Sequence, residues 1–204
     1  MDNLIKNNNI ILSMFLIIGI AGCSTPKVYL NNDSPNTVGS TSKYKCNYNP
    51  KAKTSGAFYK TDGPLEMPSW VNNVLEPIPK YEPLHKWANR PYNRLEQDFI
   101  PLTKVGNYNQ KGIATWYGKR YHGQNTSSGE KYDMFQMTAA SPVLPIPSYA
   151  RVTNLKNGRS VVVRINDRGP FLKGRIIDLS FLAACQLDYA IQGSTDVQVI
   201  SLNP

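Results

Sequence analysis

A carboxylate at the end of a predicted strand is the first candidate for chemistry in this sequence. Residues 159–165 are rich in β-branched side chains, which favour a strand. The run stops at Asn-Asp-Arg-Gly-Pro, residues 166–170, where glycine and proline end sheet pairing. Asp167 therefore stands at a strand end between Arg164 and Arg168. A carboxyl group held in this way can take part in acid–base chemistry, and the alternative is that Asp167 only forms the turn.

A second carboxylate closes a polar loop upstream. Residues 121–130 are mainly Gly, Ser, Thr and Asn and end in Glu130. Glu130 is either a site residue or a solvated loop charge. His122 in the same loop is suited equally to a site role and to a structural hydrogen bond. Trp116, in the run before the loop, is as suited to the core as to a binding platform.

Composition excludes several other kinds of site. Two histidines and three cysteines lack the spacing of a zinc site, and there is no P-loop, dinucleotide fingerprint or nucleophile elbow. The net charge of +9 is spread along the chain and favours anionic surroundings, such as a cell-wall polymer or a membrane surface. No basic stripe accompanies a nucleic-acid-binding motif. We therefore expect no metal, no cofactor and no nucleic-acid partner.

The elements that must position these residues are short strands. Runs typical of strands lie at 112–118, 149–155, 159–167, 176–179 and 197–202. Asn157-Gly158 between two of them predicts a type I′ hairpin. Ser180 is placed to cap a helix of about two turns over 181–187. Many short strands with one or two short helices predict a mainly β protein built on a small barrel.

Several blocks resemble the rare lipoprotein A (RlpA) family. They are G-I-A-T-W-Y-G at 112–118, Y-H-G-Q-N-T-S-S-G-E-K-Y-D at 121–133 and the run from R-V-T-N to N-D-R-G-P-F at 151–171. The resemblance covers about 112–202. It implies a six-stranded double-psi β-barrel and lytic transglycosylase activity on peptidoglycan, with a preference for glycan strands that lack stem peptides.

The resemblance also implies roles for particular residues. It places the two functional carboxylates at Asp167 and Glu130, and we expect Asp167 to be the acid/base residue. His122, Trp116, Tyr117 and Arg168 are the expected substrate-binding residues. Arginines that pointed at Asp167 would oppose the retention of its proton, so we expect Arg164 and Arg168 to face elsewhere, or to bind Glu130 or the sugar amides. The alternative function is a non-catalytic, expansin-like module that binds peptidoglycan.

The sequence departs from the family pattern in two places. Family members commonly end in a sporulation-related repeat domain that binds denuded glycan, and no such repeat precedes Pro204. This puts septal targeting in doubt. Ser141 stands where the family usually has a histidine after Thr-Ala-Ala, so any role of that histidine is missing here.

The N-terminal residues predict export and lipidation. An apolar run at 10–20 follows Lys6 and is too short to span a bilayer, but it suits a signal peptide over 1–22. Ala21-Gly22-Cys23 is similar to a lipobox, which implies acylation of Cys23 and a stable lipid anchor. By resemblance to the sorting of Gram-negative lipoproteins, Ser24 after the cysteine favours the periplasmic face of the outer membrane over retention in the inner one. The alternative is an ordinary signal peptide with an incidental Cys23.

The middle of the chain divides into two predicted parts before the barrel domain at 110–204. Residues 23–64 read as a disordered tether. Residues 65–109 carry many aromatic and aliphatic side chains, so we expect irregular structure that packs on the barrel, with a segment that binds division-complex proteins as the alternative. Cys46 and Cys185 lie in an oxidising compartment, where a disulfide between them and a buried free thiol at Cys185 are both open.

Overall fold

The computed structural model describes residues 39–49, 51 and 62–204. The predicted signal peptide at 1–22, the lipidation site Cys23 and most of the predicted tether lie outside these residues. Among the helices in the described part of the chain, none is long and apolar enough to cross a membrane.

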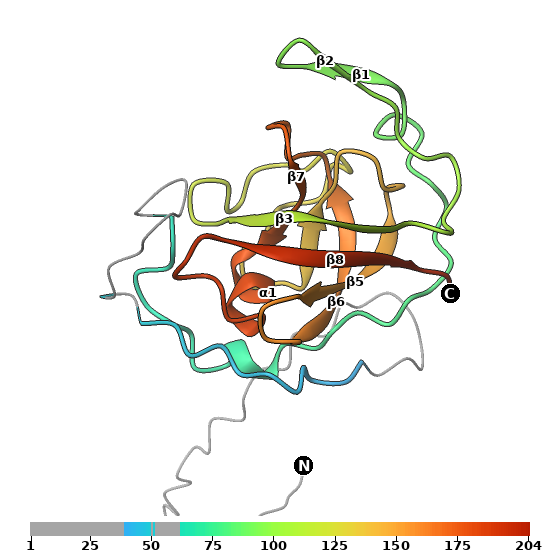
Figure 1. The fold of residues 1–204 in the computed structure, drawn as a ribbon. Coiled ribbons are helices and arrows are strands. Elements are labelled where there is room, and N and C mark those ends of the chain that lie inside the picture. The colour runs from blue at the N-terminus through green and yellow to red at the C-terminus, as the bar shows by residue number, and fades with distance from the viewer. Residues whose placement is uncertain (1–38, 50, 52–61) are drawn as a thin grey trace, which may run out of the picture.

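A closed barrel of six strands forms the centre of the fold (Figure 1). Around the barrel the strands are β3 (Asn109–Tyr117), β7 (Arg175–Ser180), β4 (Thr138–Ala140), β6 (Ser160–Asp167), β5 (Ser148–Asn154) and β8 (Ser194–Leu202). The pairs β3–β7 and β4–β6 are parallel, and the other neighbours are antiparallel. The predicted mainly β fold with a six-stranded barrel is confirmed.

Alternation along β6 decides which of its side chains are available for chemistry. Val161, Val163 and Ile165 are buried in the barrel core. Because successive side chains of a strand point to opposite faces, Arg164 lies on the outer face, where loops can reach it. The parallel pairing of β6 with β4 shifts by one residue between Ile165 and Asp167, at the end of the strand.

Helix α1 (Phe181–Gln186) packs against β7, β3 and β6. It begins where the sequence predicts, since Ser180 Oγ accepts a hydrogen bond from the backbone N–H of Ala183 at 3.3 Å. All six residues of the helix are buried.

The β5–β6 hairpin forms, but the predicted type I′ turn is wrong. Five residues, 155–159, connect the strands, and within them only Gly158 has a positive φ, +73°. The side-chain amides of Asn154 and Asn157 both donate to the carbonyl of Leu187, at 2.9 and 3.0 Å. These contacts with the end of α1 hold the connection in a wider loop than a two-residue turn.

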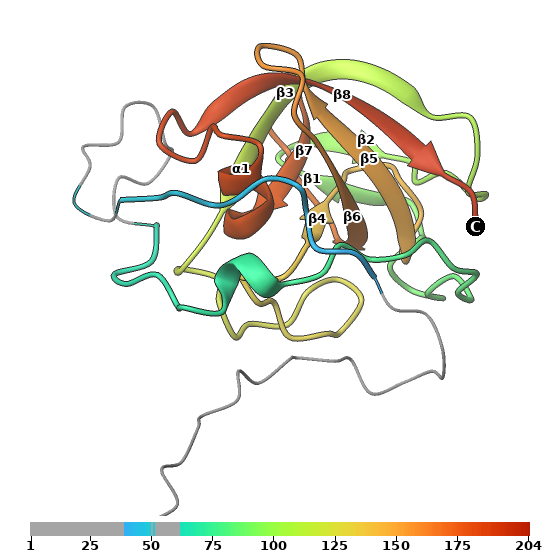
Figure 2. The ribbon, with the colours of Figure 1, turned by 90° about the horizontal axis from the view of Figure 1, so that it is seen from below.

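The described residues upstream of the barrel run along its outer surface (Figures 1 and 2). Their regular structure is a single 3-10 turn, η1 (Val71–Asn73), and a hairpin of β1 (Tyr92–Arg94) and β2 (Gln97–Phe99) that projects from the barrel at the top of Figure 1. Residues 65–109 are otherwise irregular and make many hydrogen bonds to the 141–147 loop.

The prediction of a disordered tether is wrong for residues 39–49. Cys46 is 5% exposed and forms a disulfide with Cys185 of α1, so the alternative of a free thiol is also wrong. The backbone N–H of Cys46 donates to Asn72 Oδ1 at 2.8 Å, and the ring of Tyr48 packs edge-on against Phe181. A covalent bond and buried contacts thus fix a stretch whose composition alone is typical of a linker.

Candidate active site

The loop that carries Glu130 is anchored at its start by Asp62. The carboxylate of Asp62 accepts hydrogen bonds from the backbone N–H groups of Gly118 and Arg120, at 2.9 and 2.7 Å, and is buried. A Cβ atom at position 118 would lie 2.1 Å from the carbonyl oxygen of Asp62. Glycine is therefore required where the loop leaves β3, because only glycine allows this approach of the two backbones.

The tip of the loop is a tight turn that presents Glu130. The N–H of Thr126 donates to the carbonyl of Glu130 at 2.8 Å, and the N–H of Gly129 donates back to the carbonyl of Thr126 at 2.9 Å. Gly129 has φ +85°, a conformation that favours glycine. The N–H of Ser128 donates to the carbonyl of Asn166 at 3.2 Å, which joins the loop to the end of β6.

One oxygen of Asp167 is held by this loop. Asp167 Oδ1 accepts hydrogen bonds from the N–H of Ser127 at 2.8 Å, from Ser127 Oγ at 2.7 Å and from the N–H of Arg168 at 2.8 Å. In the described part of the chain no hydrogen bond to Oδ2 is found. The side chain is thus fixed in direction and keeps one oxygen available for a proton or a substrate atom.

Glu130 is held by the same end of β6. Arg164 Nη1 lies 2.8 Å from both of its carboxylate oxygens, and Asn166 Nδ2 donates to Oε2 at 2.9 Å. The side chain of Glu130 is still 42% exposed. The structure therefore brings the two predicted carboxylates together, each bound across the contact between residues 126–130 and the end of β6.

Arg164 faces two carboxylates at once, and neither is Asp167. Its Nε and Nη2 donate to Glu82 at 2.8 and 2.9 Å, while Nη1 faces Glu130. Burial lowers the pKa of the Arg164 guanidinium, but the two carboxylates outweigh burial and raise the pKa above its ordinary value. Arg164 was expected to avoid Asp167, and either to face elsewhere or to bind Glu130 or the sugar amides; of these alternatives the structure shows the contact with Glu130.

Glu82 comes from the irregular upstream segment. Its Oε1 also accepts a hydrogen bond from the hydroxyl of Tyr149. Burial raises the pKa of the Glu82 carboxyl, but the hydrogen bonds from Arg164 and Tyr149 bring the net pKa below its ordinary value. The sequence offers no signal for Glu82, because it lies 82 residues before its partner.

Arg168 points into the protein, so its predicted role in substrate binding is not supported. Its guanidinium donates to the carbonyls of Ala88, Ser141 and Leu144 at 2.9, 3.0 and 2.6 Å, and to Asn89 Oδ1 at 2.8 Å. Burial lowers the pKa of Arg168 to about 10, so the guanidinium is still charged at neutral pH. Arg168 joins the end of β6 to two segments of backbone.

The prediction that Trp116 binds substrate is wrong. Trp116 is 9% exposed, its indole N–H donates to the carbonyl of Ala190 at 3.0 Å, and its ring meets Phe181 edge-on. It faces the core because it alternates with Thr115 and Tyr117 along β3.

Tyr117 and His122 have protein partners at their rings. Tyr117 stacks on Tyr132 with ring centroids 4.1 Å apart, and burial raises the pKa of its hydroxyl well above the ordinary value. His122 Nδ1 accepts a hydrogen bond from the N–H of Met134 at 3.2 Å and lies 3.6 Å from Asp133 Oδ1. Its side chain is 46% exposed. Their roles in substrate binding stay predictions.

An aromatic cluster that sequence reasoning did not assign to the site lies beside Asp167. Tyr92 and Phe99 of the projecting hairpin stack at 5.1 Å, and both meet Phe171 edge-on. Burial raises the pKa of the Tyr92 hydroxyl, and the nearby charges of Arg168 and Asp167 act on it in opposite directions. The sequence shows these rings only as apolar groups, since the fold alone brings them to the end of β6.

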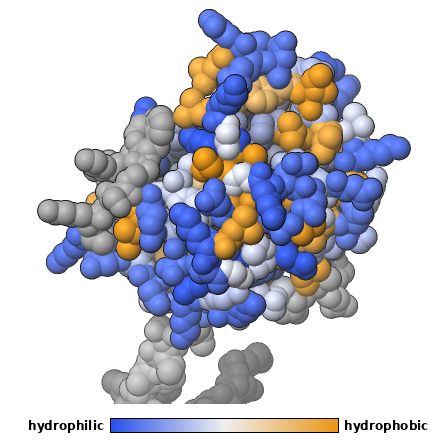
Figure 3. Space-filling model, in the orientation of Figure 1, coloured by the Kyte–Doolittle hydropathy of each residue, from blue (hydrophilic) through white to orange (hydrophobic). Residues whose placement is uncertain are grey.

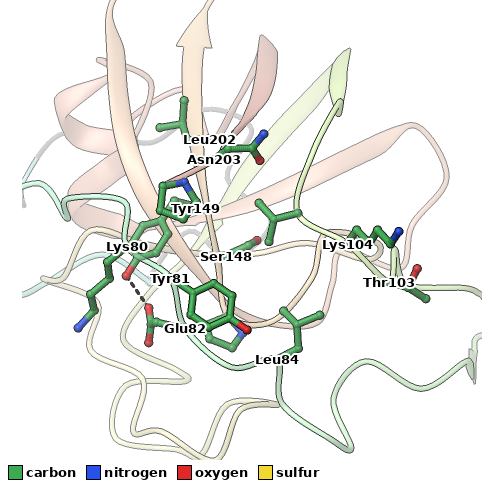
Figure 4. Close-up of a pocket in the computed structure, with 13 residues that line it drawn as sticks. Lys80, Tyr81, Glu82, Leu84, Thr103, Lys104, Ser148, Tyr149, Leu202 and Asn203 are labelled. Carbon is green, nitrogen blue, oxygen red and sulfur yellow. Dashed lines mark hydrogen bonds between the residues drawn. The ribbon is translucent and has the colours of Figure 1, made fainter.

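Glu82 also lines a cavity of about 460 Å³ (Figure 4). Its wall includes Tyr81, Leu84, Lys104 and Tyr149, and the dashed line in Figure 4 marks the hydrogen bond between Tyr149 and Glu82. Neither Asp167 nor Glu130 belongs to its wall. Glu82 is thus shared between the cavity and the arginine that holds Glu130.

The lowered pKa of Glu82 predicts how stability depends on pH. Such a carboxylate contributes stability that is complete above its unfolded-state pKa, ordinarily 4.5, and is lost as the pH falls through the folded-state pKa. The difference in free energy of unfolding between wild type and Glu82→Gln should therefore be largest above about pH 4.5 and shrink at lower pH.

Urea unfolding at pH 7 and at pH 3 measures that difference. Asp98→Asn, on the exposed strand β2, is the control and should differ little from wild type at either pH. A Glu82→Gln difference that is equally large at both pH values would contradict the prediction.

Residues 109–199 match the family described as "Lytic transglycolase". The endolytic peptidoglycan transglycosylase RlpA of Neisseria meningitidis serogroup B is 50% identical over 127 residues, which are 62% of this chain and 53% of that protein. The protein of the same name from Vibrio cholerae serotype O1 is 36% identical over 193 residues, 94% of this chain and 63% of its own.

The chain spans between about half and two thirds of the length of these curated relatives. Among solved structures, the Streptomyces papain inhibitor is similar with a TM-score of 0.40 and 19% identity, over 49% of this chain and all of that one.

Proposed function

This chain belongs to the RlpA family, and on that premise we propose that it is an endolytic lytic transglycosylase that cleaves peptidoglycan glycan strands. The observation that carries the proposal is the joint placement of Asp167 and Glu130 by one loop and one strand end. The bond cleaved is that between N-acetylmuramic acid and N-acetylglucosamine, and the product carries a 1,6-anhydromuramic end.

Asp167 fits the acid/base role. A proton on Oδ2 passes to the glycosidic oxygen as the bond from that oxygen to C1 of the muramic acid breaks. The 6-hydroxyl of the same sugar then bonds to C1 and returns its proton to Asp167, so no water is consumed. Oδ1 stays bound to Ser127 throughout, which keeps the carboxyl group in one orientation.

Glu130 fits the role of a fixed negative charge. Both of its oxygens accept hydrogen bonds from Arg164 or Asn166, which orient the carboxylate without burying it. A carboxylate held in this way stabilises the positive charge that develops at C1 and can orient the 6-hydroxyl. The two carboxylates thus have different environments and different tasks.

The face of the molecule seen in Figure 3 is mainly hydrophilic with separate hydrophobic patches, as suits a protein that acts on a polar polymer. Sugar rings combine polar edges with apolar faces, and the cluster of Tyr92, Phe99 and Phe171 beside Asp167 offers aromatic rings of the kind that pack on such faces. A preference for strands without stem peptides belongs to this proposal.

Digestion of peptidoglycan stripped of its stem peptides tests the function. Mass spectrometry should find new 1,6-anhydro ends after incubation with the wild-type protein. Glycan that sediments with the protein but gains no such ends would instead support the expansin-like binding module. Intact peptidoglycan in a parallel digestion measures the preference for denuded strands.

We also propose a lipid anchor at Cys23 that places the domain at the periplasmic face of the outer membrane. The support is the apolar run at 10–20 followed by Ala21-Gly22-Cys23-Ser24. The variant Cys23→Ala should move the protein from the outer-membrane fraction to another fraction of the cell, as seen by fractionation and immunoblotting. An unchanged distribution would contradict the anchor. Division-complex proteins that bind 65–105 remain a proposed class of partner.

A further inference from the structure

We propose that residues 80–90, upstream of the family match at 109–199, are part of the active site, with Glu82 as a positioning residue for Glu130. The inference rests on the proposed function, because it concerns how the catalytic carboxylates are held. It extends the catalytic unit beyond the barrel to a segment that composition describes only as irregular.

Residues 80–90 contact the site in two ways, and the first is through three charged side chains in a row: Glu82, Arg164 and Glu130. Glu82 binds the Nε and Nη2 edge of Arg164, at 2.8 and 2.9 Å, and Nη1 of the same guanidinium binds Glu130 at 2.8 Å. A guanidinium is planar and rigid, so a carboxylate that grips one edge also fixes the direction of the remaining N–H groups. Glu82 therefore decides where Arg164 holds Glu130.

Glu82 is itself firmly placed and largely shielded from solvent. Its side chain and that of Arg164 are each 20% exposed, whereas Glu130 is 42% exposed. The hydroxyl of Tyr149, from β5, donates to Glu82 Oε1. In this row of charged side chains, Glu82 is thus the shielded end, fixed by Tyr149. Glu130 is the solvent-exposed end, which is available to the substrate.

The net charge of these three side chains also predicts that loss of the Glu82 carboxylate weakens the action of Glu130. With Glu82 ionised, the group of Glu82, Arg164 and Glu130 carries a net charge of −1. Without the charge of Glu82, Arg164 and Glu130 would form a neutral pair, and Glu130 would stabilise a positive centre at C1 less well. Arg164 would also be free to turn away from the direction that it now holds.

The second contact of residues 80–90 with the site supports Asp167 through Arg168. The carbonyl of Ala88 and the side chain of Asn89 accept hydrogen bonds from the Arg168 guanidinium, and the backbone N–H of Arg168 donates to Asp167 Oδ1. The same stretch of chain therefore braces the residues next to both carboxylates. This coincidence distinguishes residues 80–90 from a segment that merely covers the barrel.

The test compares two carboxylates of the upstream segment. Glu82→Gln removes the charge that faces Arg164 and keeps the shape of the side chain. Glu76→Gln is the matched control, since Glu76 Oε2 accepts a hydrogen bond from the N–H of Val162 in β6. Within the described residues, Glu76 forms no side-chain hydrogen bond or ion pair with Asp167, Glu130 or Arg164. Both variants are made in the full chain and assayed on denuded glycan.

We expect kcat of Glu82→Gln to fall about 10- to 100-fold with little change in KM, because the loss is one of orientation and charge in the transition state. Glu76→Gln should keep the wild-type kcat. A wild-type kcat for Glu82→Gln would overturn the proposal, and so would losses in both variants that follow only their melting temperatures.

A spectroscopic readout separates this inference from the proposed function. The Nε–H signal of Arg164 in a ¹⁵N correlation spectrum should be sharp in wild type and Glu76→Gln, and should shift or broaden in Glu82→Gln. An unchanged signal would overturn the positioning role, whether or not the protein cuts glycan. Wild-type protein that makes no anhydro ends would instead contradict the proposed function.

Discussion

Replacement of Asp167 by asparagine should lower the rate of 1,6-anhydro end formation by about 10²- to 10⁴-fold, the range that a positioned general acid/base contributes. The physical reason lies at Oδ2, the oxygen without a hydrogen bond from the described residues. In the variant this atom becomes an amide nitrogen, which cannot donate a proton to the leaving oxygen or take one from the 6-hydroxyl.

The fold should tolerate this change. The amide oxygen of asparagine can still accept the three hydrogen bonds that Asp167 Oδ1 receives from Ser127 and Arg168. Thermal unfolding of the variant should therefore resemble that of wild type, so that the loss of rate is chemical in origin.

The measurement is a time course of anhydro ends by mass spectrometry at matched protein concentration. Asp196→Asn, an exposed carboxylate on β8, is the control and should keep the wild-type rate. Equal product from Asp167→Asn and wild type would refute the choice of Asp167 as acid. Glu130 would then be the remaining candidate for the general acid.

Loss of the disulfide should give the largest change in stability. Cys46 and Cys185 are separated by 139 residues, and cross-links that close long loops restrict the unfolded chain strongly. We expect Cys46→Ala to lower the free energy of unfolding by about 2–5 kcal/mol. The bond also holds residues 39–49, whose Ser40 carbonyl accepts the N–H of Glu76, on the upstream segment that leads to the site.

Urea unfolding with and without reductant tests this prediction. Wild-type protein should lose stability when a reductant is added, whereas Cys46→Ala should be insensitive to it. The double variant Cys46→Ala/Cys185→Ala checks that a leftover thiol is not the cause of the change. Equal stability of oxidised wild type and both variants would show that the cross-link does not constrain the unfolded chain as expected.

Local sequence was sufficient to predict the elements around the site. The β-branched run before Asp167 and the Gly-Pro after it predicted a strand end, and Ser180 predicted the start of a helix. These features depend on neighbours within a few residues, which is the range over which propensities and caps act. The hairpin turn was predicted wrongly because a distant carbonyl, that of Leu187, competes for its asparagines.

The roles of the arginines and aromatic residues could be predicted only in part. Successive side chains of a strand point to opposite faces of the sheet, but only the closed barrel decides which of the two faces is buried. Trp116 was therefore open between core and platform until the barrel buried it. The direction of the Arg168 side chain could not be predicted either. The carbonyl oxygens that bind its guanidinium inside the protein belong to residues far away in the chain.

The sequence by itself determined the barrel and the two carboxylates that its motifs place at a strand end and a loop tip. Only the tertiary structure decided what surrounds them: the disulfide, the inward turn of Arg168, and the chain from Glu82 through Arg164 to Glu130. The reason is the range of the interactions. Strand ends and turns arise from local preferences, whereas a charge finds its partner only after the barrel has closed and the upstream segment has packed on it.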